Sequence, residues 1–192
     1  MPLQSIPPPP SVWETYRESM VDLLGPHGPE AQFYHVPVAT LDAEDLAKGA
    51  TLQDTQPSGC RIVAAWGEFV PGLDGTVTSC EMTNPTLYGQ AQFRNFVHGD
   101  LPAMAFGRIT EAQGLAPMQT GDFELHFLSI PGIQLQALRL VCMGQGSDLI
   151  LPVLSGDPRL TTDAVLEADD FLALARTIAA ERLALPVNDL SS

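Results

Sequence analysis

Apolar side chains recur at helical spacing near the N-terminus of the chain. Val12, Tyr16 and Met20 follow one another at every fourth residue, which would place them on one face of a helix. Gly25-Pro26 comes directly after this pattern, and both residue types end helices. The spacing therefore predicts an amphipathic helix over residues 12–24.

A second helical pattern lies close to the C-terminus. Phe171, Leu174, Ala175 and Ile178 stand at positions i, i+3, i+4 and i+7, so they would form one apolar stripe along a helix. We predict that this helix ends before Pro186, because proline cannot continue it.

Between these helices, residues 122–154 show the two-residue period of β-strands. In the run DFELHFLSI, apolar and more polar residues alternate. Pro131-Gly132 and residues 144–148 interrupt the pattern, and their composition is typical of turns. The segment therefore predicts a three-stranded antiparallel meander.

The other segments give shorter predictions. Pro37 would confine its strand to a sheet edge or interrupt it, because proline has no N–H to donate to a neighbouring strand. Residues 86–114 show no consistent period, and we expect residues 104–110 to be extended. The further predicted elements are a strand over 32–41, a short helix over 42–48, a polar loop over 50–59, and strands over 60–70 and 76–82.

Helices that flank a run of antiparallel strands are typical of the α+β class. We expect one α+β domain over residues 11–186, with an antiparallel meander sheet and the N-terminal and C-terminal amphipathic helices packed on one face of it. A length of 192 residues fits a single domain. Residues 1–10, which end in four prolines, are predicted to form a flexible arm, and residues 187–192 a loose tail.

The charge balance narrows the class of partner. The chain has 23 acidic and 9 basic residues, which gives a net charge of −14. A field of this sign repels nucleic-acid phosphates and anionic lipids, so we expect neither nucleic acid nor a membrane as a partner. The N-terminal residues lack the pattern of a secretion signal, and no apolar run is long enough to cross a bilayer. The expected location is cytoplasmic.

The cysteines and histidines do not indicate a cofactor or a metal site. Cys60, Cys80 and Cys142 are too few and too far apart for a disulfide framework, and we expect them to be reduced, buried strand residues. The four histidines lack the close pairs of a metal centre. The run GQGSDL has leucine where a dinucleotide-binding loop needs its third glycine. We therefore expect no cofactor and no bound metal.

The segment VHGDLP, residues 97–102, places His98 and Asp100 on either side of Gly99. A His–Asp pair can act as a base and its orienting carboxylate. The same glycine, aspartate and proline are also the residues that build turns. We favour the turn, and we keep His98, Asp100 and His126 as candidate catalytic residues.

Two functions of different classes fit this sequence. The first is a non-catalytic, acidic interaction module that binds a protein partner or forms a homodimer. It is favoured because apolar residues occupy both alternating positions of the predicted meander and would need cover. The alternative is a small hydrolase or isomerase that uses a His/Asp pair in an apolar pocket.

Overall fold

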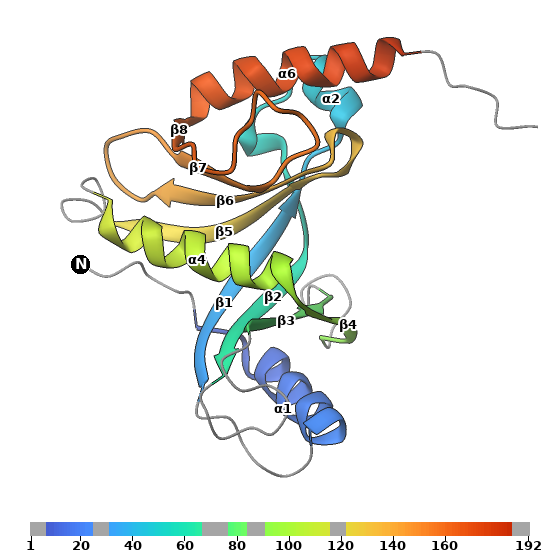
Figure 1. Ribbon diagram of the computed structural model, residues 1–192, viewed down its shortest axis with the longest axis vertical. Helices are drawn as coiled ribbons and strands as arrows, with labels where there is room; N and C mark the ends of the chain where they lie inside the picture. Colours follow the sequence, from blue (N-terminus) through green and yellow to red (C-terminus); the bar gives the residue numbers. More distant parts are fainter. Residues whose placement is uncertain (1–6, 25–30, 67–76, 84–90, 116–121, 186–192) are drawn as a thin grey trace, which may run out of the picture.

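The computed structural model of the protein describes residues 7–24, 31–66, 77–83, 91–115 and 122–185. These residues form an α+β fold built on one eight-stranded sheet with the order β4-β3-β2-β1-β5-β6-β7-β8 (Figure 1). The strands are β1 (Ala31–Thr40), β2 (Gln56–Trp66), β3 (Val77–Met82), β4 (Phe93–His98), β5 (Phe123–Ile130), β6 (Leu135–Cys142), β7 (Leu149–Leu154) and β8 (Leu166–Glu167).

Four α-helices and two short 3-10 helices accompany the sheet in the described residues. They are α1 (Pro10–Leu24), α2 (Ala43–Ala47), α4 (Asp100–Gly114), α6 (Ala168–Ala184), η1 (Leu52–Asp54) and η2 (Pro131–Ile133). The predicted helices at the two ends of the chain are present as α1 and α6. Of the helices described, none has the length and apolar character that a membrane crossing requires.

Two antiparallel half-sheets meet at one short parallel junction. β1 pairs with β5 only from Val38–Phe127 to Thr40–Ser129, whereas the other neighbouring strands pair antiparallel. Pro37 stands just before the first of these pairs, and it has no N–H with which to extend them. Upstream of that point the two strands diverge (Figure 1). Pro37 does not interrupt β1, which is continuous and central in the strand order. At Pro37 itself β1 pairs only with β2, so the proline lies on a locally unpaired edge, just before the β5 pairing begins.

Alternation along β5 sends neighbouring side chains to two different helical layers. Phe127 lies in a buried cluster with Ile109 of α4. The next residue, Leu128, lies in a separate cluster with Phe171 of α6 and Leu46 of α2. The two faces of this half-sheet are thus covered by different helices, and α6 packs beside α2 (Figure 1).

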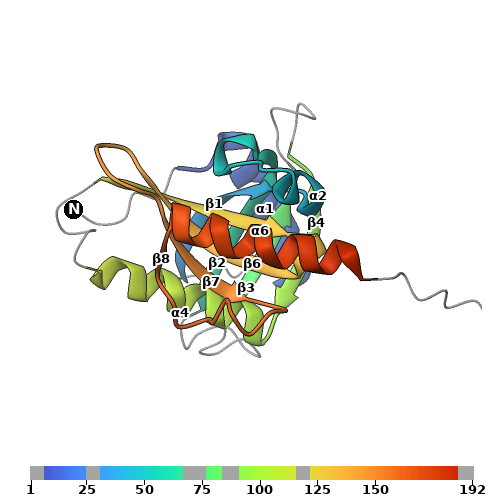
Figure 2. The same ribbon diagram turned by 90° about the horizontal axis from the view of Figure 1, so that it is seen from above.

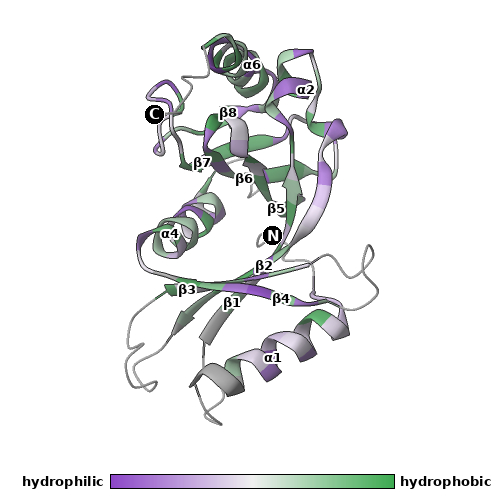
Figure 3. Cartoon of the chain, turned by 90° about the vertical axis from the view of Figure 1, so that its right-hand side faces the viewer, coloured by the Kyte–Doolittle hydropathy of each residue, from purple (hydrophilic) through white to green (hydrophobic). Residues whose placement is uncertain are grey.

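The same alternation on β1 places α1 on the side of the sheet that carries α6. Val36 belongs to the α4 cluster, and Phe33 packs against the cluster that contains Tyr16 of α1. Because Val38 of β1 is paired with Phe127 of β5, the α4 face runs continuously across both half-sheets. α1 and α6 therefore share the other face, as predicted, while α4 covers the opposite one (Figures 2 and 3).

The predicted meander is present as β5, β6 and β7, paired antiparallel in that order. Its first turn is η2, after which Gln134 adopts a left-handed conformation with φ of 53°. Leu138 of β6 faces the α4 cluster, and its neighbour Ala137 faces the α6 cluster. The apolar residues at both alternating positions are thus covered by helices of the same chain, so this pattern by itself does not require a partner.

The segment over residues 104–110 is helical rather than extended, because it lies within α4. Gly99 turns the chain from β4 into this helix with a φ of 100°, in the left-handed region that favours glycine. Pro102 lies in the first helical turn, where the missing N–H has no partner to lose. Leu101 lies inside the helix, although a proline disfavours the helical conformation for the residue before it.

The polar loop expected over residues 50–59 is also shorter than predicted. η1 occupies its middle, and β2 begins at Gln56, opposite Thr40 at the end of β1. Pairing with β1 thus overrides the turn-like composition of this segment. The predicted elements over residues 67–70 and 86–90 and the tail over 187–192 lie outside the described residues.

Candidate binding groove

The face that carries α1 and α6 is left open between the start of α1 and η1. A groove of about 630 Å³ crosses the sheet there, at the junction of the two half-sheets. We call it the central groove. Its floor comes from β2, β1, β5 and β6. Its lining includes Pro37, Cys60, Glu124, His126 and Arg139, with Leu52 of η1 at one wall.

Glu124 and His126 form the polar centre of the groove. They are two residues apart on β5, so their side chains leave the same face of the strand, and His126 Nε2 lies 3.5 Å from Glu124 Oε2. Burial lowers the pKa of His126, and the nearby Glu124 carboxylate opposes that shift only in part. His126 is therefore neutral at pH 7 and supplies no positive charge beside Glu124.

Arg139 lies next to His126 on β6, as its register partner. Its Nε donates to Asp148 Oδ2 at 2.8 Å, and its Nη1 donates to the Leu52 carbonyl at 2.8 Å. Asp148 Oδ1 in turn accepts from the Cys142 N–H at 2.9 Å. The arginine thus joins η1 and the β6–β7 loop to the floor of the groove through hydrogen bonds, and its charge is balanced by Asp148.

Two side chains of the groove carry a thiol or a hydroxyl, and neither group is activated. Burial raises the pKa of the Cys60 thiol to about 11, so it is not a thiolate near neutral pH. The Thr55 hydroxyl donates to the Leu52 carbonyl at 3.0 Å rather than to a base. The groove residues in the described part of the chain therefore offer polar contacts but no activated thiol or hydroxyl.

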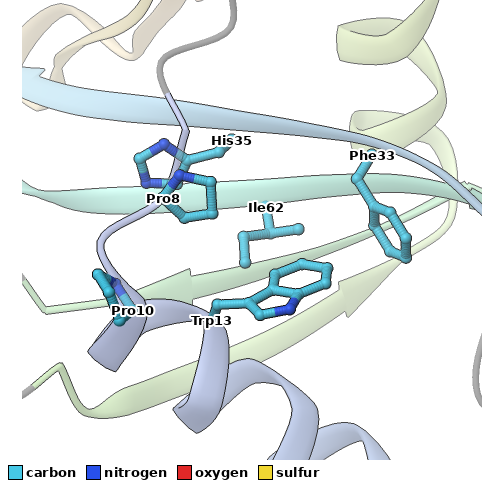
Figure 4. A pocket seen from close by; sticks show the side chains of 6 residues that line it. All are labelled: Pro8, Pro10, Trp13, Phe33, His35 and Ile62. Atoms are coloured by element: carbon cyan, nitrogen blue, oxygen red, sulfur yellow. The ribbon is translucent and has the colours of Figure 1, made fainter.

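A second hollow, which we call the ring pocket, adjoins the central groove. It measures about 510 Å³ and lies between α1 and the first residues of β1 (Figure 4). Trp13 comes from α1, Phe33 and His35 from β1, and Ile62 from β2. The remaining lining residues are Pro8 and Pro10. His35 lines the central groove as well, so the two hollows are neighbours.

The proline segment before α1 separates the ring pocket from the central groove. Pro8 and Pro10 line the ring pocket, and Pro7 and Pro9 line the groove. The Pro9 carbonyl accepts from the Val12 N–H at 2.9 Å and thereby fixes the end of the segment to the first turn of α1. In Figure 4 the ring of Pro8 lies beside the imidazole of His35. The segment therefore forms part of the site.

The three candidate catalytic residues do not share one site. His126 is in the central groove, whereas His98 lies on β4 and Asp100 begins α4. β3, β2 and β1 stand between β4 and β5, which amounts to four strand spacings of about 4.8 Å each. The backbone at Gly99 has the positive φ that the turn interpretation requires, and Asp100 is exposed in the first turn of α4.

Several residues of the site escaped the sequence analysis, above all Trp13, Phe33, His35 and Arg139. The first three lie within the helix predicted over residues 12–24 and the strand predicted over 32–41, and the arginine lies within the predicted meander, but the sequence singles out none of them. Nothing local marks them, because each is brought into the site by strand pairing between distant segments. Among the residues that the structure describes, no group of three or more His, Cys, Asp or Glu side chains is placed to hold a metal ion.

Cys60 and Cys80 are buried and Cys142 is partly exposed, and all three are free thiols in the structure. Burial raises the pKa of Cys80 to about 12.

Comparisons with models of protein families, with curated proteins and with solved structures found no match to this chain. A function can therefore be inferred only from the geometry and charge of the site itself.

Proposed function

We propose that the protein is a non-catalytic interaction module whose central groove binds an extended, positively charged segment of a partner protein. The observation that carries the proposal is an open groove at the sheet junction whose polar centre holds the Glu124 carboxylate, which forms no ion pair with a Lys or Arg side chain of the described residues. Its shape, its charge and the state of its side chains each support this choice.

The shape of the groove suits a short stretch of extended chain. Its floor takes in β2, β1, β5 and β6. Three spacings between paired strands span about 14 Å, and the floor is wider than this where β1 and β5 diverge beyond their three residue pairs. An extended chain rises about 3.3 Å per residue, so at least about four residues would cross the floor. The apolar lining, which includes Pro37, Val38 and Val141, provides contact area, and the polar centre provides orientation.

The charge of the groove indicates that the bound segment of the partner is positively charged. Arg139 is balanced by Asp148, and His126 is neutral at pH 7 because burial lowers its pKa. The Glu124 side chain is 29 % exposed, so it can accept from a Lys or Arg side chain in the groove. The net charge of −14 attracts a basic segment over longer range and speeds its association.

The state of the groove residues favours binding over catalysis. A hydrolase needs a nucleophile or a water held by a base, and the thiol of Cys60 stays protonated because burial raises its pKa to about 11. His126 is directed toward Glu124 and is separated from the other two candidate catalytic residues by three strands. The alternative of a small hydrolase or isomerase therefore has less support than the interaction module.

Self-association remains a prediction of its own. A second copy has the same net charge of −14, so the acidic groove would repel it. The helices of the chain also cover both faces of the meander already. A cationic segment of a different protein is therefore the occupant that we favour. The cytoplasmic location is likewise proposed on the sequence pattern alone.

A positional-scanning library of nine-residue peptides tests the proposal, because it can be used before the partner is identified. Each sub-library fixes one residue type at one position, and binding to the full-length protein is measured by fluorescence polarisation. We expect Lys or Arg to be enriched at one or two adjacent positions. In Glu124→Gln this enrichment should fall about three-fold, the effect of a partly exposed ion pair.

Glu18→Gln serves as the matched control, because it removes the same charge from an exposed position on α1. It should leave the preference for basic residues unchanged. The proposal fails if the library shows no positional preference, or if the preference for Lys and Arg is the same in Glu124→Gln as in the wild type.

A further inference from the structure

The ring pocket is an apolar hollow with walls of fixed geometry. Trp13 stacks on Tyr16 with 5.4 Å between ring centroids, and it meets Phe33 edge-on at 5.5 Å with an interplanar angle of 85°. Ile62 is buried beneath them, whereas Trp13 and Phe33 are only partly buried. The pocket thus presents two aromatic rings, held by their packing, to whatever enters it (Figure 4).

The size and polarity of the pocket define the class of its ligand. Apolar cavities of about 150 Å³ in proteins stay dry and accept benzene, and the ring pocket measures about 510 Å³. His35 is the one polar side chain among its six lining residues. Perpendicular rings such as Trp13 and Phe33 offer both a face and an edge to a third ring, which is the arrangement that aromatic groups prefer.

We propose that the ring pocket is the anchor site for an aromatic side chain of the segment bound in the central groove. This inference rests on the proposed function and extends it from the charge of the partner to a second determinant. The two hollows share His35, and the proline segment stands between them. A partner segment would place its basic residue at Glu124 and its aromatic residue at Trp13.

The anchor can be tested with a single-ring probe, without the partner. The probe is N-acetyl-phenylalaninamide, and its binding to the full-length protein is followed by saturation-transfer difference NMR, which observes the probe itself. We expect a dissociation constant in the millimolar range, as for other ligands of this size. N-acetyl-leucinamide should bind at least three-fold more weakly, and N-acetyl-glycinamide should give no signal.

Two variants locate the binding. Trp13→Ala should weaken the phenylalanine probe at least five-fold, because it removes the face against which the ring packs. Phe33→Ala removes the opposing ring and should act alike, so it replaces Trp13→Ala if the circular dichroism of that variant shows loss of folding. Glu18→Gln, at an exposed position of α1, should leave the binding of the probe unchanged. The proposal is overturned if the wild type gives no saturable signal, if the leucine probe binds equally well, or if both ring variants bind as the wild type does.

The failure of this inference and that of the proposed function are distinguishable. If the ring probe binds at Trp13 while the peptide library shows no preference for basic residues, the aromatic anchor site is supported and the proposal of a cationic segment is wrong. If Lys or Arg is selected in a manner that depends on Glu124 but no ring probe binds, the groove function stands and the anchor is wrong. If both hold, aromatic residues should also be enriched in the library, a few positions from the basic one.

Discussion

Removal of the guanidinium of Arg139 should destabilise the protein far more than the same change at an exposed arginine. The side chain of Arg139 is 9 % exposed and that of its partner Asp148 is 16 % exposed. In Arg139→Met the Asp148 carboxylate keeps the Cys142 N–H, and the Leu52 carbonyl loses one of its two donors, with the Thr55 hydroxyl remaining. Breaking a buried ion pair from one side costs about 3–5 kcal/mol, so we expect a loss of that order in the free energy of unfolding.

Arg159→Met is the matched control. Arg159 makes two ion pairs, with Asp157 at 2.9 Å and with Glu181 at 2.5 Å, where Arg139 makes one, but its side chain is 40 % exposed. Water and salt screen such pairs, so the change should be several-fold smaller than at Arg139. The contrast separates burial from the mere number of ion pairs, because the substitution and the hydrogen-bonding group are the same at both positions.

The assay is equilibrium unfolding in urea at pH 7.5, followed by far-ultraviolet circular dichroism. The double variant Arg139→Met/Asp148→Asn completes the test, because asparagine keeps an acceptor for the Cys142 N–H and no longer leaves a buried charge. It should recover about 1–3 kcal/mol relative to the sum of the single changes. If Arg139→Met costs no more than Arg159→Met, or if the two changes at the pair are simply additive, the assignment of Arg139 as the fastener of the groove floor is refuted.

Three further predictions concern the groove and its surroundings. Burial lowers the pKa of His126, so the folded state binds fewer protons there than the unfolded chain, and stability should fall as the pH drops below about 6.5, the value in the unfolded chain. The difference in the free energy of unfolding between pH 7.5 and pH 5 should therefore be smaller in His126→Gln, and an equal difference would contradict the assignment. Because burial raises the pKa of Cys60 to about 11 and that of Cys80 to about 12, a thiol reagent at pH 8 should label the partly exposed Cys142 first. Cys142→Ser should abolish the fast phase, and rapid reaction of all three thiols would show that the buried pair is accessible. The homodimer expected from the apolar composition of the chain stays a separate prediction from the groove: sedimentation velocity at micromolar concentration would show it as a dimer that loosens at low salt, and a monomer at every salt concentration would exclude it.

The elements that the sequence predicts are those whose pattern is local. The apolar positions of α1 and α6 and the alternation of β5 decide their own structure, because each period is complete within a few turns or residues. α4 was missed for the opposite reason. Pro102 and Gly107 lower its helical signal, and the helix is held by burial of Ala105 and Ile109 against strands that belong to both half-sheets.

The candidate site was accessible to the sequence only in fragments. The spacing of Glu124 and His126 shows that both leave one face of a strand, and the structure confirms this with a contact of 3.5 Å. The spacing in the sequence could not show that His35 lines the same groove as Glu124 and His126, because this depends on the parallel pairing of β1 with β5. No local rule selects that pairing, since the two strands are separated in the chain by several other strands and helices.

The groove follows from the way in which the two half-sheets are joined. A parallel junction of three residue pairs leaves β1 and β5 free to diverge, and Pro37 at its start supplies no N–H to prolong it. On one face α4 crosses the junction and buries it. On the other face α1 and α6 pack on the outer parts of the two half-sheets, so the centre stays uncovered there and Glu124 retains access to a ligand. A change that lengthened the β1–β5 pairing, or that moved the proline segment toward α6, would therefore close the groove to the proposed partner segment even with Glu124 intact.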